Sequence, residues 1–228
     1  MFGYFSHGLI RKYVIVFGSM FNDLTVQRNN GSSRIQTLAV PIAYGPKQKF
    51  LVRLDTDPNL DREIAISLPR IGFELSGISY DSNRKLNSAQ KNTYDHTDKN
   101  FRKTQYTPVP YNIDFTMSIF VKNADDGTQI LEQILPYFKP EWNMSVNLVP
   151  EMNIKMDIPT VLNSVDFEDT YDGDFQTRRA IIWNLNFTMK GYLYGPVSNQ
   201  GVIKRISVDI YEDDADFTFL QSLGYIND

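Results

Sequence analysis

The sequence predicts an α+β fold, in which a mostly antiparallel β-sheet carries two principal helices packed on it, with a long loop or arm and a C-terminal tail. The first observation is the segment 106–140, where a long alternating strand leads through an acidic cap into an amphipathic helix. The second is a pair of alternating runs, 160–167 and 175–194, on either side of an Asp- and Gly-rich turn at 171–174. This pattern predicts a hairpin.

The strand in segment 106–140 has one apolar face, because successive side chains of a strand point to opposite sides. That face carries Ile113, Phe115, Met117 and Ile119. The helix after it has Asn123 at the cap position, and Asp125 and Asp126 complement the positive end of its dipole. Its apolar stripe consists of Ile130, Leu131, Ile134, Leu135 and Phe138, and its end is marked by Pro136 and Pro140.

The chain before this block predicts a helix and several strands. Apolar residues recur at helical spacing between Leu9 and Leu24, and Ser6 stands where it would cap this helix. A hairpin is predicted from the strands 24–28 and 34–44, because the residues between them, Asn-Asn-Gly-Ser, tolerate positive φ. The other strands predicted before residue 82 are 47–55 and 71–80.

Segment 82–107 is different in composition, because it is polar and almost free of aliphatic residues. It predicts a long exposed loop, or an arm that becomes ordered only on contact with a partner. Strands are expected again at 144–149, 152–156 and 204–211, and an acidic cluster at 212–216 leads into a short apolar tail. We expect residues 1–197 to form a single core domain, followed by a C-terminal strand and tail at 198–228.

Composition limits the classes of function. Hydrophobic residues make up 42% and charged residues 22% of the 228 residues, as is ordinary for a globular protein. The absence of Cys excludes disulfides and thiol catalysis. The net charge of −4 argues against non-specific binding of nucleic acid as the main function. No run of about 18 apolar residues is present, so we expect no membrane span.

Motifs for catalysis or cofactor binding are missing from the sequence. It contains neither a glycine-rich phosphate-binding motif nor a nucleophile elbow nor the zinc-protease pattern. His96 lies between Asp95 and Asp98, but one His with flanking carboxylates in a polar loop is an incomplete metal-ligand set. We therefore expect no enzyme activity, no cofactor and no metal.

Charged and aromatic residues are the candidates for an interaction surface. The arm 82–107 is positive within an acidic protein, which indicates either electrostatic docking onto an acidic partner or a plain charged loop. The strand 204–211 is a candidate for pairing with a neighbouring subunit by strand addition. The candidate interface residues are Arg84, Lys85, Lys91, Lys99, Arg102, Lys103, Arg178, Arg179, Arg205, Asp213, Asp214, Phe217 and Phe219.

Several segments, taken in order, resemble one family of phage proteins. They are residues 1–5, 40–44, 68–71, 130–138, Asp172-Gly173-Asp174 with Arg178, Arg179 and Trp183, and 191–197. The chain is similar in these segments to the tail-completion and sheath-stabiliser proteins of T4-like contractile-tailed bacteriophages. The resemblance covers roughly residues 1–197, and members with long Pro-rich C-terminal extensions differ from this chain after Val197.

The resemblance implies a structural role. Such proteins form a homo-hexameric ring at the head-proximal end of the tail, made in the host cytoplasm and incorporated into the virion. The implied partners are the tail sheath protein, the tail tube terminator and the neck or connector proteins. Double-stranded DNA would cross the ring channel without specific binding, and neither catalytic residues nor a membrane are implied.

Other classes remain open from the residues alone. The chain could be another head–tail connector or neck protein, since such rings share a general architecture. It could also be a monomeric ligand-binding β-rich module, which would show a small-molecule site. A hydrolase that relies on acidic residues is the third alternative, although no pair of them lies on a recognisable cleft element.

Overall fold

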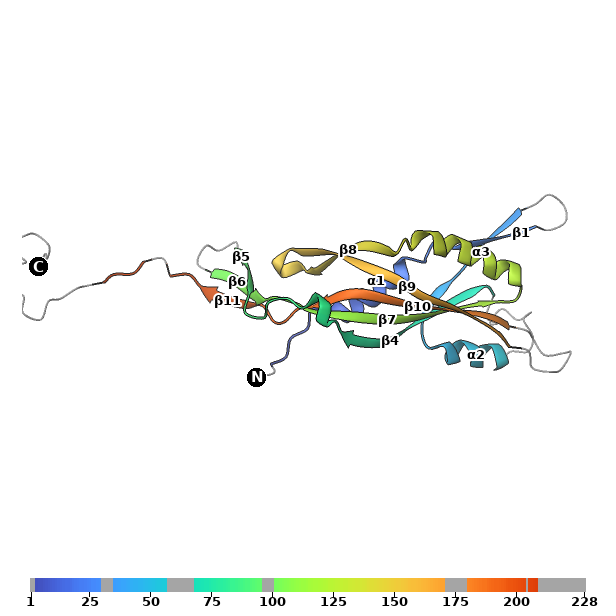
Figure 1. Ribbon diagram of the computed structural model, residues 1–228, viewed down its shortest axis with the longest axis horizontal. Coiled ribbons are helices and arrows are strands. Elements are labelled where there is room, and N and C mark those ends of the chain that lie inside the picture. Colours follow the sequence, from blue (N-terminus) through green and yellow to red (C-terminus); the bar gives the residue numbers. More distant parts are fainter. Residues whose placement is uncertain are drawn as a thin grey trace, which may run out of the picture.

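The computed structural model describes residues 3–29, 35–56, 68–95, 101–170, 180–203 and 205–208. Its centre is a six-stranded sheet in which only the pair β3–β4 is parallel, and all other neighbours are antiparallel (Figure 1). The predicted α+β class with a mostly antiparallel sheet is confirmed. In spatial order the strands are β3 (Ile42–Tyr44), β4 (Arg70–Tyr80), β7 (Val109–Val121), β10 (Ala180–Leu193), β9 (Ile154–Thr170) and β8 (Glu141–Val149).

Two smaller sheets and three α-helices complete the described chain. The strands β1 (Thr25–Asn29) and β2 (Ile35–Ala39) form a hairpin. The terminal sheet, as we call it, consists of β11 (Ser198–Gly201), β6 (Phe101–Tyr106) and β5 (Lys91–Asp95). The helices are α1 (Leu9–Ser19), α2 (Lys47–Thr56) and α3 (Ala124–Ile134), with 3₁₀ turns at Ser82–Arg84, Leu135–Tyr137 and Pro150–Met152.

The alternation seen in the sequence becomes an apolar inner face and a polar outer face of the sheet. On the inner face, Ile113 and Phe115 of β7 and Phe187 of β10 are fully buried, as predicted. On the outer face, Ser118 Oγ donates to Asn184 Oδ1 at 2.8 Å, and Asn184 Nδ2 donates to Glu168 Oε1 at 2.7 Å. These side-chain bonds join β7, β10 and β9 across the outer face. Near α2 this face is covered as well, because Phe120 and Ile182 form a small buried apolar cluster with Phe50 of that helix.

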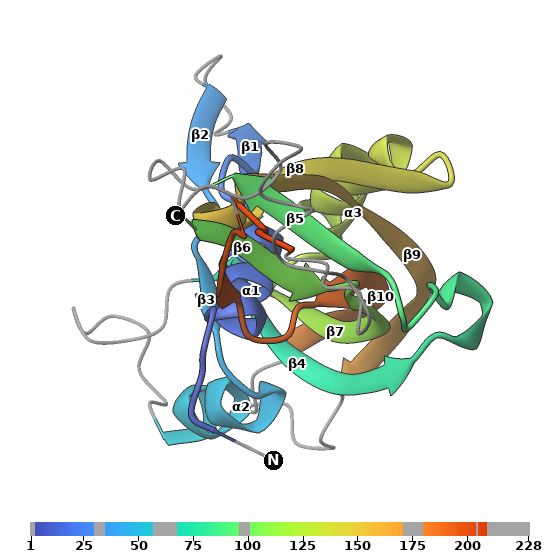
Figure 2. The same cartoon turned by 90° about the vertical axis from the view of Figure 1, so that its left-hand side faces the viewer.

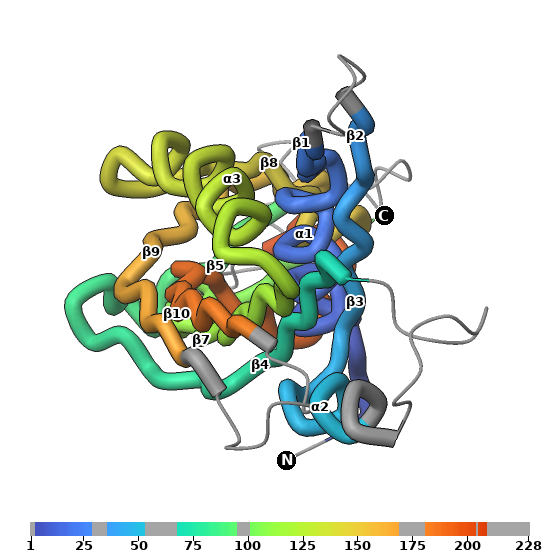
Figure 3. The backbone as a smooth tube through the Cα atoms, turned by 90° about the vertical axis from the view of Figure 1, so that its right-hand side faces the viewer, coloured from blue at the N-terminus to red at the C-terminus, as the bar shows by residue number. Residues whose placement is uncertain are grey.

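Helix α1 lies on the inner face, and the sheet curves around it (Figure 2). Its Phe17 is fully buried, stacks on Phe115 at a centroid distance of 4.3 Å and meets Phe187 edge-on at 5.2 Å. Helix α3 packs into the same core through Ile130 and Ile134. Figure 3 shows the two helices next to each other, with α2 beyond β4.

The end of α1 nearest the terminal sheet is fixed by Tyr13. Its hydroxyl donates to the Tyr192 carbonyl at 2.7 Å and accepts from the Tyr192 N–H at 2.9 Å. The ring lies so close to β10 that a Cβ at Gly191 would come within 3.0 Å of Tyr13 Cζ. Only glycine therefore permits this close approach of helix and strand.

The hairpin β1–β2 is held on α3 by side chains that bind its backbone. Gln133 accepts from the Thr25 N–H and donates to the Thr25 carbonyl, and Gln129 does the same at Gln27. The two amides, one helical turn apart, thus occupy the edge of β1 as a neighbouring strand would. Arg28 adds an ion pair with the buried Asp126 in the first turn of α3.

Several predictions of local structure were wrong. The strand predicted at 34–44 is divided into β2 and β3, which belong to different sheets. Residues 47–55 form α2 instead of a strand, and Phe50 of this helix covers Gly72 on the outer face, where a Cβ would come within 2.5 Å of the Phe50 ring. Segment 82–107 contains the strands β5 and β6, because their backbones pair although their side chains are polar. The described part of the predicted strand 204–211, residues 205–208, is not a strand; the pairing strand is β11.

The predicted helix caps were partly right. Asn123 stands at the N-cap of α3, but its side chain makes no capping hydrogen bond. Ser6 does not cap α1, because Gly8 occupies the cap position with a φ of 62° that glycine adopts without strain. Ser6 Oγ instead accepts a hydrogen bond from the Gly8 N–H. The turns predicted at 29–32 and 171–174 lie largely or wholly outside the described residues.

We expect the chain to lose stability between about pH 10 and pH 12. Burial raises the pKa of the Tyr13 and Tyr194 phenols to about 12, whereas an unfolded chain releases these protons near about pH 10. Because the unfolded state loses its protons first, the stabilisation is fully present below about pH 10 and is lost as the pH rises through about 12. Urea unfolding at about pH 8 and about pH 11 measures this loss.

The variant Tyr13→Phe should lose less stability than the wild type between about pH 8 and about pH 11. It should also be less stable at neutral pH, by about 1–3 kcal/mol, because the buried backbone groups of Tyr192 lose their partner. Tyr4→Phe is the matched control, since Tyr4 is 100% exposed and should change neither quantity. An alkaline loss in Tyr13→Phe equal to that of the wild type would contradict the assignment.

Candidate functional site

The terminal sheet continues the central strands beyond the core. Strand β6 passes into β7 through residues 107–108, and β10 passes into β11 through 194–197. At this junction Arg84 fixes the 3₁₀ turn that follows β4. Its Nε donates to Asp81 Oδ2 at 2.7 Å, and its Nη2 donates to the Tyr111 carbonyl at 3.1 Å. The guanidinium carbon lies 5.1 Å from the centroid of the Tyr192 ring, so three elements meet at this side chain.

The hydrogen bond from Arg84 holds the pKa of Asp81 below its ordinary value of 3.8. Arg84 was predicted from the sequence as a candidate interface residue. Its side chain is half-buried, and its charge is already paired within the chain. The neighbouring Lys85 is exposed.

Three of the other basic candidates, Lys91, Arg102 and Lys103, lie on the terminal sheet but do not share one face. Lys91 stands opposite Tyr106, with its Nζ 4.8 Å from the centroid of that ring. Arg102 and Lys103 are successive residues of β6, so their side chains point to opposite faces of the terminal sheet. The structure therefore brings these three residues to one end of the molecule and divides their charge between two faces.

The described residues that follow β11 form an exposed apolar run. Ile203 is 78%, Ile206 76% and Val208 72% exposed, and the chain leads from β11 away from the body (Figure 1). Arg205, a sequence candidate, is exposed within this run. We use the name apolar run for Val202, Ile203 and residues 205–208. Large aliphatic side chains at such exposure indicate a surface that a partner covers.

A second exposed feature is the open edge, by which we mean the outer edge of β4 from Glu74 to Tyr80. Strand β3 pairs only with Ile71–Phe73, and none of the other described strands pairs with the outer edge beyond them. Ile78 is 41% and Tyr80 48% exposed there. An unpaired edge of this length is a template for another strand.

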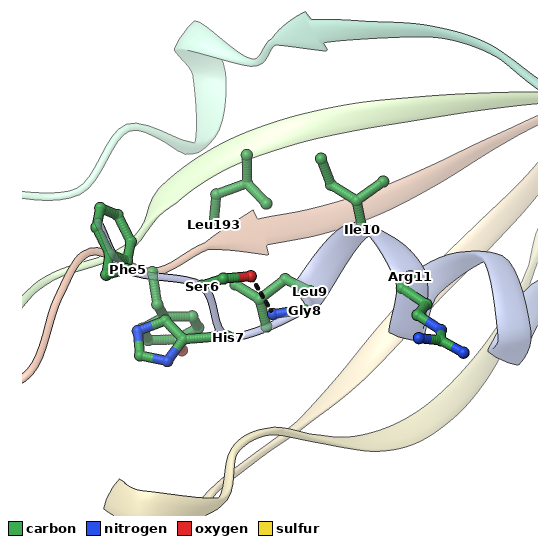
Figure 4. A pocket seen from close by; sticks show the side chains of 9 residues that line it. Phe5, Ser6, His7, Gly8, Leu9, Ile10, Arg11 and Leu193 are labelled. Atoms are coloured by element: carbon green, nitrogen blue, oxygen red, sulfur yellow. Dashed lines mark hydrogen bonds between the residues drawn. The ribbon is translucent and has the colours of Figure 1, made fainter. Parts of the chain in front are cut away.

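A cavity of about 420 Å³ lies beside the N-terminal segment, lined by residues 5–11 with Leu193 and Tyr194 (Figure 4). Two of its polar side chains are paired within the chain: His7 Nε2 hydrogen-bonds the Gly195 carbonyl at 2.8 Å, and Ser6 Oγ accepts from the Gly8 N–H. Among the residues described, no cluster of three His, Asp or Glu could hold a metal ion, and no helix is long and apolar enough to cross a membrane. The cavity thus presents an apolar wall without converging reactive groups.

The remaining sequence candidates lie outside the described residues. These are Lys99, Arg178, Arg179, Asp213, Asp214, Phe217 and Phe219, together with His96. Two features of the surface were not predicted as such. The strand 71–80 was predicted, but its unpaired edge was not. A strand was predicted at 204–211, but the exposure of Val202, Ile203 and residues 205–208 beyond β11 was not predicted.

A sheet with an unpaired edge and an exposed apolar run is typical of proteins that act by binding other chains. The comparisons with known proteins specify the family. The tail sheath stabiliser family of T4-like Myoviridae viruses matches residues 4–225. The chain belongs to this family, as the sequence resemblance predicted.

One relative extends the match over most of both chains. The chain is 33% identical over 224 residues to the tail completion protein gp15 of Enterobacteria phage T4, which covers 95% of this chain and 82% of that protein. The match reaches beyond Val197, where the segments that carried the resemblance end.

We expect Arg84→Ala to lower the melting temperature clearly, because it removes hydrogen bonds to Asp81 and to β7, removes the contact with the Tyr192 ring, and leaves Asp81 without its cation. The stabilisation of Asp81 is present above its unfolded pKa and is lost as the pH falls through its lower folded pKa. The difference in melting temperature between Arg84→Ala and wild type should therefore become smaller in acid, while the part that comes from the hydrogen bonds to Tyr111 and Asn112 should remain. Lys85→Ala is the control and should leave the melting temperature nearly unchanged. Thermal unfolding at neutral and acidic pH measures both, and equal effects of the two variants would contradict the role of Arg84.

Proposed function

We propose that this chain is a structural virion protein that forms a hexameric ring, caps the head-proximal end of the contractile sheath and tube, and joins the tail to the neck during assembly. The observation that carries the proposal is the family match over residues 4–225. The relative named as a tail completion protein supports it over nearly the same length. In this function the chain is not an enzyme and needs no cofactor.

The surface features are compatible with a ring. A closed ring with cyclic symmetry requires two different surfaces on each subunit, one that meets the preceding copy and one that meets the next. The apolar run and the open edge are two such surfaces on different elements of this chain.

The proposed partners are the sheath protein, the tube terminator and the neck or connector proteins. Lys91, Arg102 and Lys103 on the terminal sheet would dock onto acidic surfaces of the sheath or neck. Double-stranded DNA would pass through the ring channel without specific contacts, in keeping with the net charge of −4.

The solution mass of the purified chain tests the ring. We expect light scattering to give a species of six times 26.3 kDa, about 158 kDa, because six copies close the ring. The same material, added to tails assembled without it, should keep the sheath extended in electron micrographs. A folded monomer that binds the neck but leaves the sheath uncapped would favour another connector and would contradict the proposal.

The docking of the terminal sheet is tested by its salt dependence. Co-sedimentation of the chain with polymerised sheath should weaken as ionic strength rises, and further in the variant Lys91→Ser with Lys103→Ser, because exposed charge pairs are screened. Lys122→Ser is the matched control, since this exposed lysine follows β7 at the opposite end of the sheet. Binding that is insensitive to both salt and the double substitution would rule out electrostatic docking here and leave the ring untouched.

A further inference from the structure

We propose that the apolar run of one copy adds as a strand to the open edge of β4 in the next copy of the chain. This inference rests on the proposed ring and deepens it, because it names the contact that links successive subunits. The acceptor is the backbone of Glu74–Tyr80, and the donor is Val202, Ile203 and residues 205–208. Strand addition of this kind uses main-chain hydrogen bonds for affinity and alternate side chains for specificity.

At the acceptor edge, the backbone groups have no strand partner among the described strands, and apolar side chains of the inner face are exposed. Its inner neighbour β7 pairs along the whole strand, with Ile78 opposite Ile113 and Tyr80 opposite Tyr111. Ile78 and Tyr80 therefore lie on the face of the sheet that carries the core, yet each remains more than 40% exposed. A further strand beside β4 would cover both side chains and continue the core outward.

The donor has the alternation that this edge requires. Ile206 and Val208 point to one side of an extended chain, and Arg205 and Ser207 point to the other. If the first pair lies next to Ile78 and Tyr80, then Arg205 and Ser207 fall on the polar outer face. That face carries the carboxylates of Glu74 and Asp114 beside the open edge, whereas the nearby Arg84 is already paired with Asp81. For residues 205–208, apolar contact and charge therefore match in one orientation, while Ile203 falls on the same side as Arg205.

A second copy is the occupant that fits the position of the two parts. The apolar run leads from β11 away from the six-stranded sheet, so it does not return to β4 of its own subunit (Figures 1 and 2). Every copy then carries one free donor and one free acceptor on different surfaces. Such a contact is heterologous, and repeated head to tail it closes into a ring when the rotation between copies permits.

The lengths of the two parts agree as well. Seven residues of β4 from Glu74 to Tyr80 span about 23 Å in extended conformation, and a donor from 202 to 208 has the same length. Other strands of the described chain also lie at a sheet edge, among them β2, β8, β5 and β11. β2 belongs to a two-stranded hairpin and continues no core face, and Lys12 already donates to the Asn147 and Leu148 carbonyls of β8. The exposed Ile78 and Tyr80 favour β4 as the acceptor.

Chemical crosslinking tests the contact, because the chain has no native Cys. We would mix equal amounts of Ser79→Cys and Ser207→Cys full-length chains and add a short bis-maleimide, which tolerates a small shift in register. We expect covalent dimers and nothing larger, since each chain carries a single cysteine, either on the open edge or on the apolar run. The chain with both substitutions should give a ladder that ends at six. The control mixture, Thr37→Cys on β2 with Ser207→Cys, should give no dimer.

A substitution in the apolar run provides a second measurement. Ile206→Pro removes an N–H and should weaken self-association by about tenfold or more, whereas Ile206→Val should retain it. Residue 206 is exposed and outside the regular elements, so neither variant should lower the melting temperature of the subunit.

The outcomes separate this inference from the function it rests on. Dimers in the Ser79→Cys and Ser207→Cys mixture, together with dissociation of Ile206→Pro, support the contact. A wild-type hexamer without dimers in that mixture overturns the pairing of the run with β4 and leaves the ring in place. A wild-type chain that stays monomeric at high concentration and forms no dimer overturns both.

Discussion

The packing of Phe17 inside the curved sheet is the interaction on which the other parts of the molecule depend. Its ring contacts Phe73 of β4, Phe115 of β7 and Phe187 of β10, so one side chain near the start of the chain joins three neighbouring strands. Burial of aromatic rings contributes about 1.5–3 kcal/mol each, and their mutual contacts add to this. Because α1 covers the inner face, the apolar side chains at the centre of the sheet are buried within one subunit. The open edge of β4 and the terminal sheet are not covered by α1 and remain accessible to other chains.

The two central strands, β7 and β10, also fix the position of the terminal sheet relative to the core. β7 and β10 pair along their whole lengths and continue into β6 and β11, with Arg84 and Tyr13 binding the backbone at the junction. The terminal sheet is thus an extension of the core strands and not a separate appendage. A protein that binds a large assembly benefits from this arrangement, since a pre-ordered surface loses less conformational entropy on binding than a mobile one.

Sequence periodicity predicted the elements that have one buried face, namely β4, β7, β9, β10, α1 and α3. It failed for α2, because among the described side chains of that helix, residues 47–52, only Phe50 is buried, and one buried residue does not produce an apolar stripe. It also failed for β5 and β6, whose pairing is through the backbone and leaves polar side chains such as Thr93 and Thr104 opposite each other. The open edge depends on where β3 ends in space, and such long-range information is absent from local patterns. The role of the basic residues at an interface stays a prediction, and the strand period of two places Arg102 and Lys103 on opposite faces of the terminal sheet.

The side-chain amides of Gln129 and Gln133, which bind the edge of β1, determine which positions of this hairpin and of α3 tolerate substitution. Gln129 and Gln133 bind only the backbone of Thr25 and Gln27, so side chains at those two strand positions are free to vary without loss of the contact. The helix positions are restricted, because only an amide offers both a donor and an acceptor at that reach, and a carboxylate would leave the strand carbonyl unpaired. In this hairpin, substitutions at Thr25 and Gln27 are therefore tolerated, whereas substitutions at Gln129 and Gln133 would remove the contact.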